Sequence, residues 1–377
     1  MARTARRAGW ILWGILAAAV PLGAQSGAGP ISPKPGVPVQ QAPPEKVPKM
    51  VVKVILVNTP VTVRNERGEM LTDLERNEFL VFDNGVEQFI THFDVGGDPL
   101  SIVIVVENSS RIRPLLKVVR KTGILFTQNV MGQTGEAAVL SVNDSIDKLV
   151  DFTGDADQIE KTFAGMKEGT SGLRLYDAMA TAVEMLQSRP ISSTGEGRRR
   201  VLVVLSEGED KGSESRLGSV LKRAQLANVA IYSVGLSTTR AELQAEPKDN
   251  TVQVSPPGTF PLPPTPGTPQ TPTSEQQRYG GADLGALVAW VVTHVEAKVK
   301  APPLQVATAG TGGVNYNTYK DASIEEAIDK IGGELHAQYS LSYALKGVAP
   351  EGYHEIRVQV LRRGTTWRAR PGYYLGS

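Results

Sequence analysis

The sequence contains no cysteine among its 377 residues and only four histidines. The lack of cysteine excludes disulfides, thiolate metal ligands, a cysteine nucleophile and a lipid-modified N-terminal cysteine. The histidines are scattered along the chain without the spacing of a metal site, so each is expected to be a surface or core residue. They are His92, His294, His336 and His354.

Catalytic signatures and excess charge are also missing. The chain has no glycine-rich phosphate loop, no His-Glu-x-x-His and no Gly-x-Ser-x-Gly. No second acid or nucleophile–base arrangement accompanies Glu107 and Glu207, the two glutamates that follow apolar strands. We therefore expect a protein that is not an enzyme. The 40 basic and 39 acidic residues give a formal net charge of +1, which does not indicate a nucleic-acid partner.

Long apolar runs are absent except near the N-terminus. Three arginines precede an apolar run from Trp10 to Val20, which is shorter than the roughly 20 residues of a membrane-spanning helix. We interpret residues 1–24 as a secretory signal cleaved after Ala24, leaving a mature chain without a transmembrane segment in the periplasm or the extracellular space. Retention of this segment as an anchor is the alternative, which Leu22 at the third position before the cut favours.

Proline marks two probable joints in the chain. Seven of the 25 prolines lie between Pro30 and Pro48, and eight lie between Pro256 and Pro272. Repeated proline favours extended, solvated chain, so we predict a linker at residues 25–48 and a loop at about residues 245–279. The loop is expected to be passive, although a segment that a partner recognises as a proline helix is an alternative.

Short alternating runs of apolar residues occur at both ends of the mature chain. Period-two alternation bounded by asparagine, aspartate and glycine is typical of strands and hairpins. We predict an N-terminal β unit at residues 49–96 and further strands at residues 337–377. Because so few N-terminal strands would leave open edges and a thin core, we expect the two sets to pair into one small β sandwich.

Between these ends, residues 97–336 alternate apolar strands with amphipathic helices. The runs at Ser101 to Val106 and Val201 to Leu205 are apolar apart from Ser101, as expected for strands buried on both faces. The order predicts an α/β domain with a doubly wound, mainly parallel, Rossmann-like sheet. Ligand sites in such sheets lie at the carboxyl ends of the strands, so the loops beginning at Glu107 and Ser206 are the candidate site.

Those loops resemble the metal-ion-dependent adhesion site of the von Willebrand factor A domain. Three segments carry the resemblance: Glu107 to Arg111, Gly172 to Met179, and Leu205 to Asp210. The flanking strands, with Ala337 to Tyr343 and Arg368 to Tyr374, are similar to the bacterial exported group called VWFA-related proteins. The resemblance implies a non-enzymatic protein that mediates adhesion or protein–protein interaction.

The site departs from the family pattern at four of its five positions. Glu107 and Glu207 replace aspartates, Arg111 replaces a serine, Leu173 replaces a threonine, and Ser109 matches. Because Mg²⁺ requires close octahedral oxygen geometry, these changes weaken a metal site. We therefore expect neither metal nor another cofactor, and predict a degenerate site in which Arg111, alone or together with Arg174, lies between the two glutamates as an internal cation.

Two alternative functions remain open at this stage. One is a structural envelope scaffold in which the site is vestigial and the β sandwich makes the contacts. The other is an adhesion module that binds Mg²⁺ or Ca²⁺ through Glu107, Ser109, Thr170 and Glu207. In every case the expected partner is a protein that the sequence does not identify.

Overall fold

The computed structural model describes residues 56–189, 198–236, 302–318, 321–345 and 350–376. All of these lie in one compact unit, Lys53–Ser377. The predicted signal at residues 1–24, the linker at residues 25–48 and the proline-rich loop at residues 245–279 lie outside the described residues.

A six-stranded sheet forms the centre of the α/β domain, in the order β10-β9-β8-β5-β6-β7. Only β7 runs antiparallel to its neighbour, so the predicted doubly wound, mainly parallel sheet is confirmed. The strand β5 is buried at every residue, because helices cover both faces of the sheet. The strands are β5 (Leu100–Glu107), β6 (Glu136–Val142), β7 (Ile146–Thr153), β8 (Arg199–Ser206), β9 (Val229–Leu236) and β10 (Asn315–Thr318).

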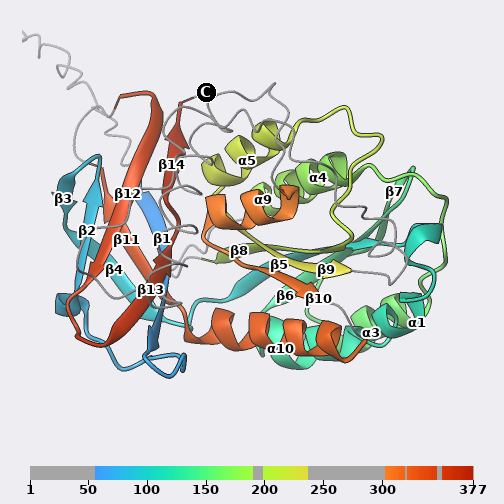
Figure 1. Cartoon of the computed structure of the whole chain (residues 1–377), viewed down its shortest axis with the longest axis horizontal. Helices are drawn as coiled ribbons and strands as arrows, with labels where there is room; N and C mark the ends of the chain where they lie inside the picture. The colour runs from blue at the N-terminus through green and yellow to red at the C-terminus, as the bar shows by residue number, and fades with distance from the viewer. Residues whose placement is uncertain (1–55, 190–197, 237–301, 319–320, 346–349, 377) are drawn as a thin grey trace, which may run out of the picture. The chain divides into compact units, whose positions relative to one another are not determined.

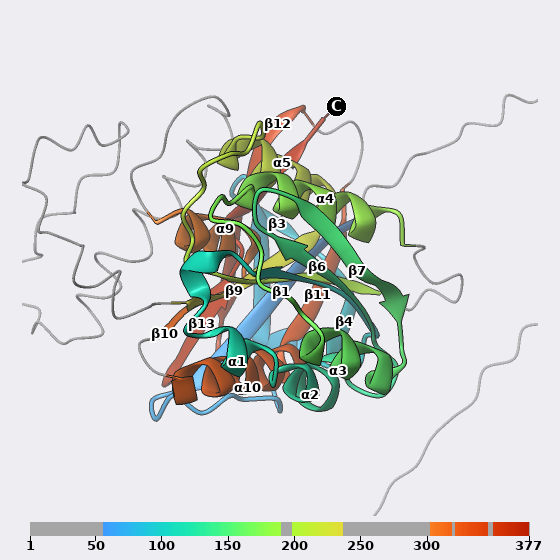
Figure 2. The same ribbon diagram turned by 90° about the vertical axis from the view of Figure 1, so that its right-hand side faces the viewer.

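Helices lie on both faces of this sheet (Figure 1). One face is covered by α4 (Leu175–Gln187), α5 (Leu217–Leu226) and α9 (Pro303–Thr311). The other is covered by α1 (Leu116–Val119), α2 (Gly123–Leu125), η3 (Phe126–Met131), α3 (Ala156–Ala164) and α10 (Asp321–Ala337). Figure 2 shows α4 and α3 on opposite sides of the outer strands β6 and β7. None of the helices in the described ranges is both long and apolar enough to cross a membrane.

Helical spacing of apolar residues explains these positions. In α4, Leu175, Met179, Val183 and Leu186 recur every three or four residues and are buried against the sheet. The start of α3 is fixed by Asp155, whose carboxylate accepts a hydrogen bond from the Gln158 backbone N–H at 3.2 Å. The local sequence therefore explains which face of α4 is buried and where α3 begins.

The N- and C-terminal strands together form two antiparallel four-stranded sheets, ordered β13-β1-β11-β4 and β14-β12-β2-β3. In the first sheet, β1 lies between β11 and β13, with Val61 opposite both Tyr339 and Ala369. In the second, β2 pairs with β12, with Val81 opposite Val358. The predicted β-sandwich unit built from both ends of the chain is thereby confirmed. Its elements are β1 (Leu56–Asn65), η1 (Arg76–Glu78), β2 (Phe79–Asp83), β3 (Val86–Gln88), β4 (Ile90–Val95), β11 (Tyr339–Ala344), β12 (Gly352–Val360), β13 (Thr365–Ala369) and β14 (Gly372–Leu375).

Buried charges connect the sandwich to the α/β domain. Glu334 of α10 is fully buried, where it accepts hydrogen bonds from Arg368 of β13 and, at 2.9 Å, from the Tyr232 hydroxyl. Arg199 donates to the Leu335 carbonyl at 2.7 Å and to the Gln338 side chain. The sequence Arg198-Arg199-Arg200 is thus not the solvated entry to a strand that a charge run usually forms, because Arg199 is buried in this connection.

Candidate functional site

The site begins where two neighbouring parallel strands end. Strands β5 and β8 pair with Val106 opposite Leu205, which brings the next residues, Glu107 and Ser206, to the same edge of the sheet. The short 3₁₀ turn η2 (Ser110–Ile112) follows Ser109 and carries Arg111 back toward this edge. The topology therefore gathers the loops that follow both strands.

The Glu107 carboxylate forms the buried base of the site. It is fully inaccessible, and its Oε1 accepts a hydrogen bond from the Ser109 hydroxyl at 2.5 Å. Its Oε2 accepts from the Ser206 hydroxyl at 2.7 Å and from the Glu207 backbone N–H at 2.9 Å. Burial of a carboxylate is costly unless donors replace its water, and here three donors do so. The same bonds fix the two loops to each other.

Gly208 permits the tight path of the second loop. Its φ of +82° is in the left-handed region that favours glycine, and its N–H donates to the Ser206 hydroxyl oxygen at 3.0 Å. The Ser206 side chain is therefore held between Glu107 and the turn. Ser206 was not among our predicted site residues.

Arg111 is surrounded by carboxylates. Its Nη2 lies 2.8 Å from Glu207 Oε2 and 2.9 Å from Glu209 Oε2. Burial acts to lower the pKa of Arg111, but the charges of Glu207, Glu209 and Glu107 outweigh it and raise that pKa above its ordinary value. The guanidinium is thus held as a fixed positive charge in contact with Glu207 and Glu209, while Glu107 acts on it through its charge alone.

Arg174 does not join Arg111 between the glutamates. Its Nε and Nη2 donate to Asp177 Oδ2 at 3.0 and 2.8 Å. Asp177 also accepts from the backbone N–H groups of Glu214 and Ser215, at 3.1 and 2.9 Å. Burial acts to raise the pKa of Asp177, yet these hydrogen bonds hold it below its ordinary value. Asp177 therefore anchors the loop at Glu214 and Ser215 beside the start of α4.

Leu173 is not placed at the surface of the site. Its side chain is fully buried in the core among residues of α4, and only its backbone takes part locally, accepting from the Lys211 N–H at 3.0 Å. A leucine at this position lies inward because burial of its side chain is more favourable than exposure in a polar loop. Leu173 is therefore a core residue and not a binding residue, contrary to our prediction.

Thr170 faces a neighbouring loop. Its hydroxyl donates to Asn143 Oδ1 at 3.0 Å, and its carbonyl accepts from the Ser110 N–H at 2.9 Å. Asn143 in turn donates to Asn108 Oδ1 at 2.9 Å, so a buried amide pair connects the loops after β5 and β6. Sequence reasoning missed Asn108 and Asn143, although Asn108 directly follows the last residue of β5 and Asn143 the last residue of β6.

Asp210 also has a structural contact that the sequence did not reveal. Its Oδ1 accepts from the Tyr176 N–H at 3.1 Å and from the Ser213 hydroxyl at 2.6 Å. It therefore caps the first turn of α4 from a different loop, where free N–H groups favour a negative charge.

The donor set does not fit a divalent cation. Both Glu107 oxygens already accept hydrogen bonds, and the Glu207 carboxylate faces the positive charge of Arg111. A cation placed here would meet a guanidinium instead of the roughly six or more oxygen ligands that Mg²⁺ or Ca²⁺ requires. Among the described residues, no cluster of three or more histidine, aspartate or glutamate side chains is arranged to hold a metal.

The solved structures that match this chain share little sequence with it. An aerotolerance-related membrane protein from Bacteroides fragilis NCTC 9343 is 13% identical, with 62% of this chain and 98% of that chain covered and a TM-score of 0.37. The conserved hypothetical protein BatB from Bacteroides thetaiotaomicron is 12% identical, with coverages of 63% and 98% and a TM-score of 0.37. The SpRpn10 VWA domain is 16% identical, with coverages of 38% and 78% and a TM-score of 0.30. No curated protein matches the sequence.

The family comparison agrees with the strand order and with the position of the polar loops. The model of the von Willebrand factor type A domain matches residues 101–253, a range that includes β5, β8 and both loops of the site. This chain therefore carries a von Willebrand factor type A domain.

Proposed function

We propose that this protein is exported and binds a protein partner through the loops after β5 and β8, without a metal ion. The observation that carries the proposal is the Arg111 guanidinium, which contacts Glu207 and Glu209 above the buried Glu107. An internal positive charge takes the role of a bound cation and holds the loops in one arrangement. Domains of this family serve as interaction modules, which supports a binding role over a catalytic one.

The outer part of the site is available to a partner. The side chains of Glu209 and Lys211 are 56% and 58% exposed and form an ion pair at 3.2 Å. Arg111 is 23% exposed, and its Nη1 is buried without a hydrogen-bond partner in the described part of the chain. A small opening of the loop would let this nitrogen donate to an acidic or carbonyl group of the partner.

Site-specific photocrosslinking tests the proposal in the host envelope. A photoreactive residue at Lys211 reports on the loops, and one at Glu355, on the exposed side of β12, reports on the sandwich. The loop probe is expected to give a crosslink that persists in EDTA and is weakened by Glu209→Lys, because that substitution reverses the charge beside Arg111. Loss of the crosslink in EDTA would contradict the metal-free mode.

A scaffold function with the contacts on the sandwich is the second candidate. It is favoured by two apolar side chains at the β3 edge, Val86 at 63% and Phe89 at 73% exposure. In that case a third probe, at Glu87 of β3, would crosslink while the Lys211 probe would not. The two candidates thus predict a crosslink from different probes: Lys211 for partner binding by the loops, and Glu87 for a scaffold.

A further inference from the structure

A second candidate site lies at the opposite end of β8. A cavity of about 350 Å³ is bordered by the first residues of β8 and β9 and by β1 and β11 of the sandwich. Strand β8 runs from Arg199 at this cavity to Ser206 at the Glu107 site, so the two sites occupy opposite edges of one sheet. The cavity volume is that of a pocket for a small molecule.

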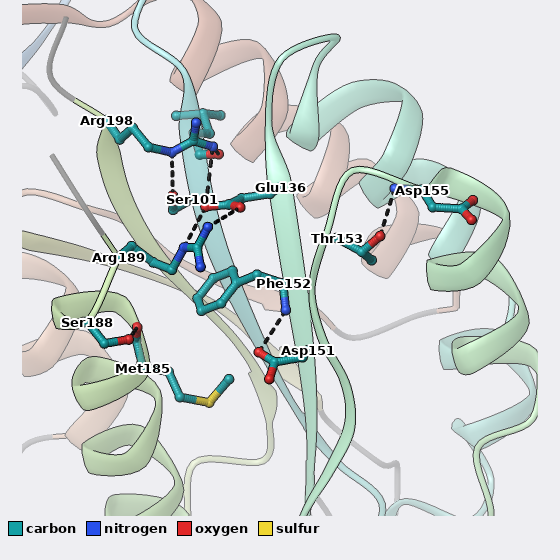
Figure 3. A network of polar contacts seen from close by, with 11 residues as sticks. Ser101, Glu136, Asp151, Phe152, Thr153, Asp155, Met185, Ser188, Arg189 and Arg198 are labelled. Carbon is teal, nitrogen blue, oxygen red and sulfur yellow. Dashed lines mark hydrogen bonds and ion pairs between the residues drawn. The ribbon is translucent and has the colours of Figure 1, made fainter. Parts of the chain in front are cut away.

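The cavity wall is strongly basic. Four arginines line it, and Asp98 is the one acidic residue among its described lining residues. Three of the arginines are already committed to protein acceptors. Arg198 donates to Ser101 and the Leu100 carbonyl, Arg199 to the Leu335 carbonyl, and Arg200 to the Ala227 carbonyl. Figure 3 shows Arg198 and Arg189 directed toward Ser101 and Glu136.

The fourth arginine, Arg370, is different. It is 4% exposed, and its Nε and Nη2 are both buried without a hydrogen-bond partner within the described ranges. Its Nη1 makes a long contact of 3.4 Å to Asn228 Oδ1, and its guanidinium lies 5.4 Å from the centre of the Tyr373 ring. A ring face attracts the charge but does not replace acceptors in the plane of the guanidinium.

The same two nitrogens have a consistent use elsewhere in this chain. Together they donate to the carboxylate of one partner in Arg113 with Glu168, Arg174 with Asp177, Arg189 with Glu136, and Arg362 with Glu78. This side-on pair of donors matches two oxygens of a carboxylate or phosphate. In Arg370 the same two nitrogens have no hydrogen-bond partner among the described residues.

One acceptor in the cavity is open as well. Asn58 of β1 lines the cavity, and its Oδ1 is buried without a partner in the described part of the chain. Native structures rarely leave such groups unsatisfied, so open donors and an open acceptor in one cavity call for an explanation. The apolar residues Val201, Val229 and Ala230 complete the wall.

We propose that this cavity binds a small organic oxyanion whose carboxylate or phosphate group accepts both hydrogen bonds of the Arg370 Nε–Nη2 pair, after a small turn of the buried side chain brings the pair to the cavity. A donor group of the ligand meets Asn58 Oδ1, and its carbon skeleton packs on the apolar wall. The site is independent of the proposed partner-binding loops, since it shares no residue with them.

Calorimetric titration of the full chain with succinate and with inorganic phosphate, at constant ionic strength in chloride, tests the proposal. At least one oxyanion is expected to bind, and Arg370→Gln to weaken that binding by about tenfold or more. Stronger binding of succinate would identify a carboxylate ligand, and stronger binding of phosphate a phosphate ligand. Neutral succinamide is expected to give no heat.

Two further variants keep the outcome decisive. Arg113→Gln removes the same charge from an exposed ion pair and is expected to leave oxyanion binding unchanged. Asn58→Leu retains Arg370 but fills part of the cavity, so it is expected to weaken binding roughly tenfold even if Arg370→Gln does not fold. If neither oxyanion binds, or if Arg370→Gln and Asn58→Leu bind as the wild type does, the open donors hold water only and the proposal is overturned.

Discussion

The buried charges at the two ends of β8 differ in how many hydrogen-bond partners they have. At the Ser206 end, the Glu107 carboxylate has three hydrogen-bond donors, and Arg111 supplies a nearby counter-charge. At the Arg199 end, Arg370 is also buried, at 4% exposure, but two of its nitrogens have no hydrogen-bond partner among the described residues. A charge neutralised from within holds loops together, whereas an open charge costs stability and remains available to a ligand.

Deleting residues 338–377 should have the largest effect. This change removes β11 to β14, which flank β1 and β2 and carry Arg370, but leaves the loops of the Glu107 site intact in sequence. We expect residues 56–95 to lose their strand structure, because both of their sheets lose the central pairing. Hydrogen exchange measured by mass spectrometry checks this, and persistent protection of Val57 to Val63 would show that the N-terminal strands fold independently.

Replacing Glu107 by alanine should have the next largest effect on stability. The change leaves the Ser109 and Ser206 hydroxyls without their acceptor and removes a counter-charge from Arg111, so the free energy of unfolding should fall by about 3–5 kcal/mol. Urea denaturation measures the loss. Glu209→Ala is the matched control at a 56% exposed carboxylate and should cost about 1 kcal/mol or less. Equal losses in the two variants would contradict the distinction between buried and exposed carboxylates.

Replacing Arg370 by methionine should change stability in the opposite direction. Without an added anion, removing a buried guanidinium of which two nitrogens have no acceptor among the described residues should raise the free energy of unfolding by about 1–2 kcal/mol. Burial lowers the pKa of Arg370 to about 10, which agrees with a cost for keeping this charge inside. A loss of several kcal/mol in the same urea experiment would mean that Arg370 is part of the core structure, not an open site.

Acid should reveal the smallest effect, at Asp177. Hydrogen bonds hold its pKa below the ordinary value, so its carboxylate contributes stability above about pH 4 that is lost as pH falls through the folded-state pKa. We expect Asp177→Asn to be less stable than the wild type at neutral pH and the difference to shrink below about pH 4. Thermal melts across this range measure it, and a constant difference would argue against a titrating Asp177.

The fold could be predicted because its signals are periodic. The fully apolar runs of β5 and β8, and the alternating residues at both ends of the chain, indicated the buried sheet and the sandwich directly. The edge of the sheet where the loops with Glu107 and Glu207 lie followed from topology. The family resemblance, together with the two like charges, indicated that Arg111 would lie near them. These inferences needed only repeated patterns, the resemblance and the chemistry of like charges.

Single loop residues could not be placed in this way. Leu173 lies in the core and Arg174 pairs with Asp177, because the path of one loop decides which side chains turn inward. Arg199 is buried by α10 and the strand that follows it, a contact between residues more than 130 positions apart. No local pattern encodes such contacts, so the sequence indicated where the site lies but not which side chains complete it.

In the proposed function, Arg111 takes the role of a cation at the loop site. Calorimetric titration of Mg²⁺ and Ca²⁺ into the wild type and Arg111→Ser tests it most directly, since the substitution removes the guanidinium and adds a hydroxyl beside Glu107, Ser109 and Glu207. We expect no binding heat for the wild type and saturable metal binding for Arg111→Ser. Metal binding by the wild type that Arg111→Ser leaves unchanged would contradict it.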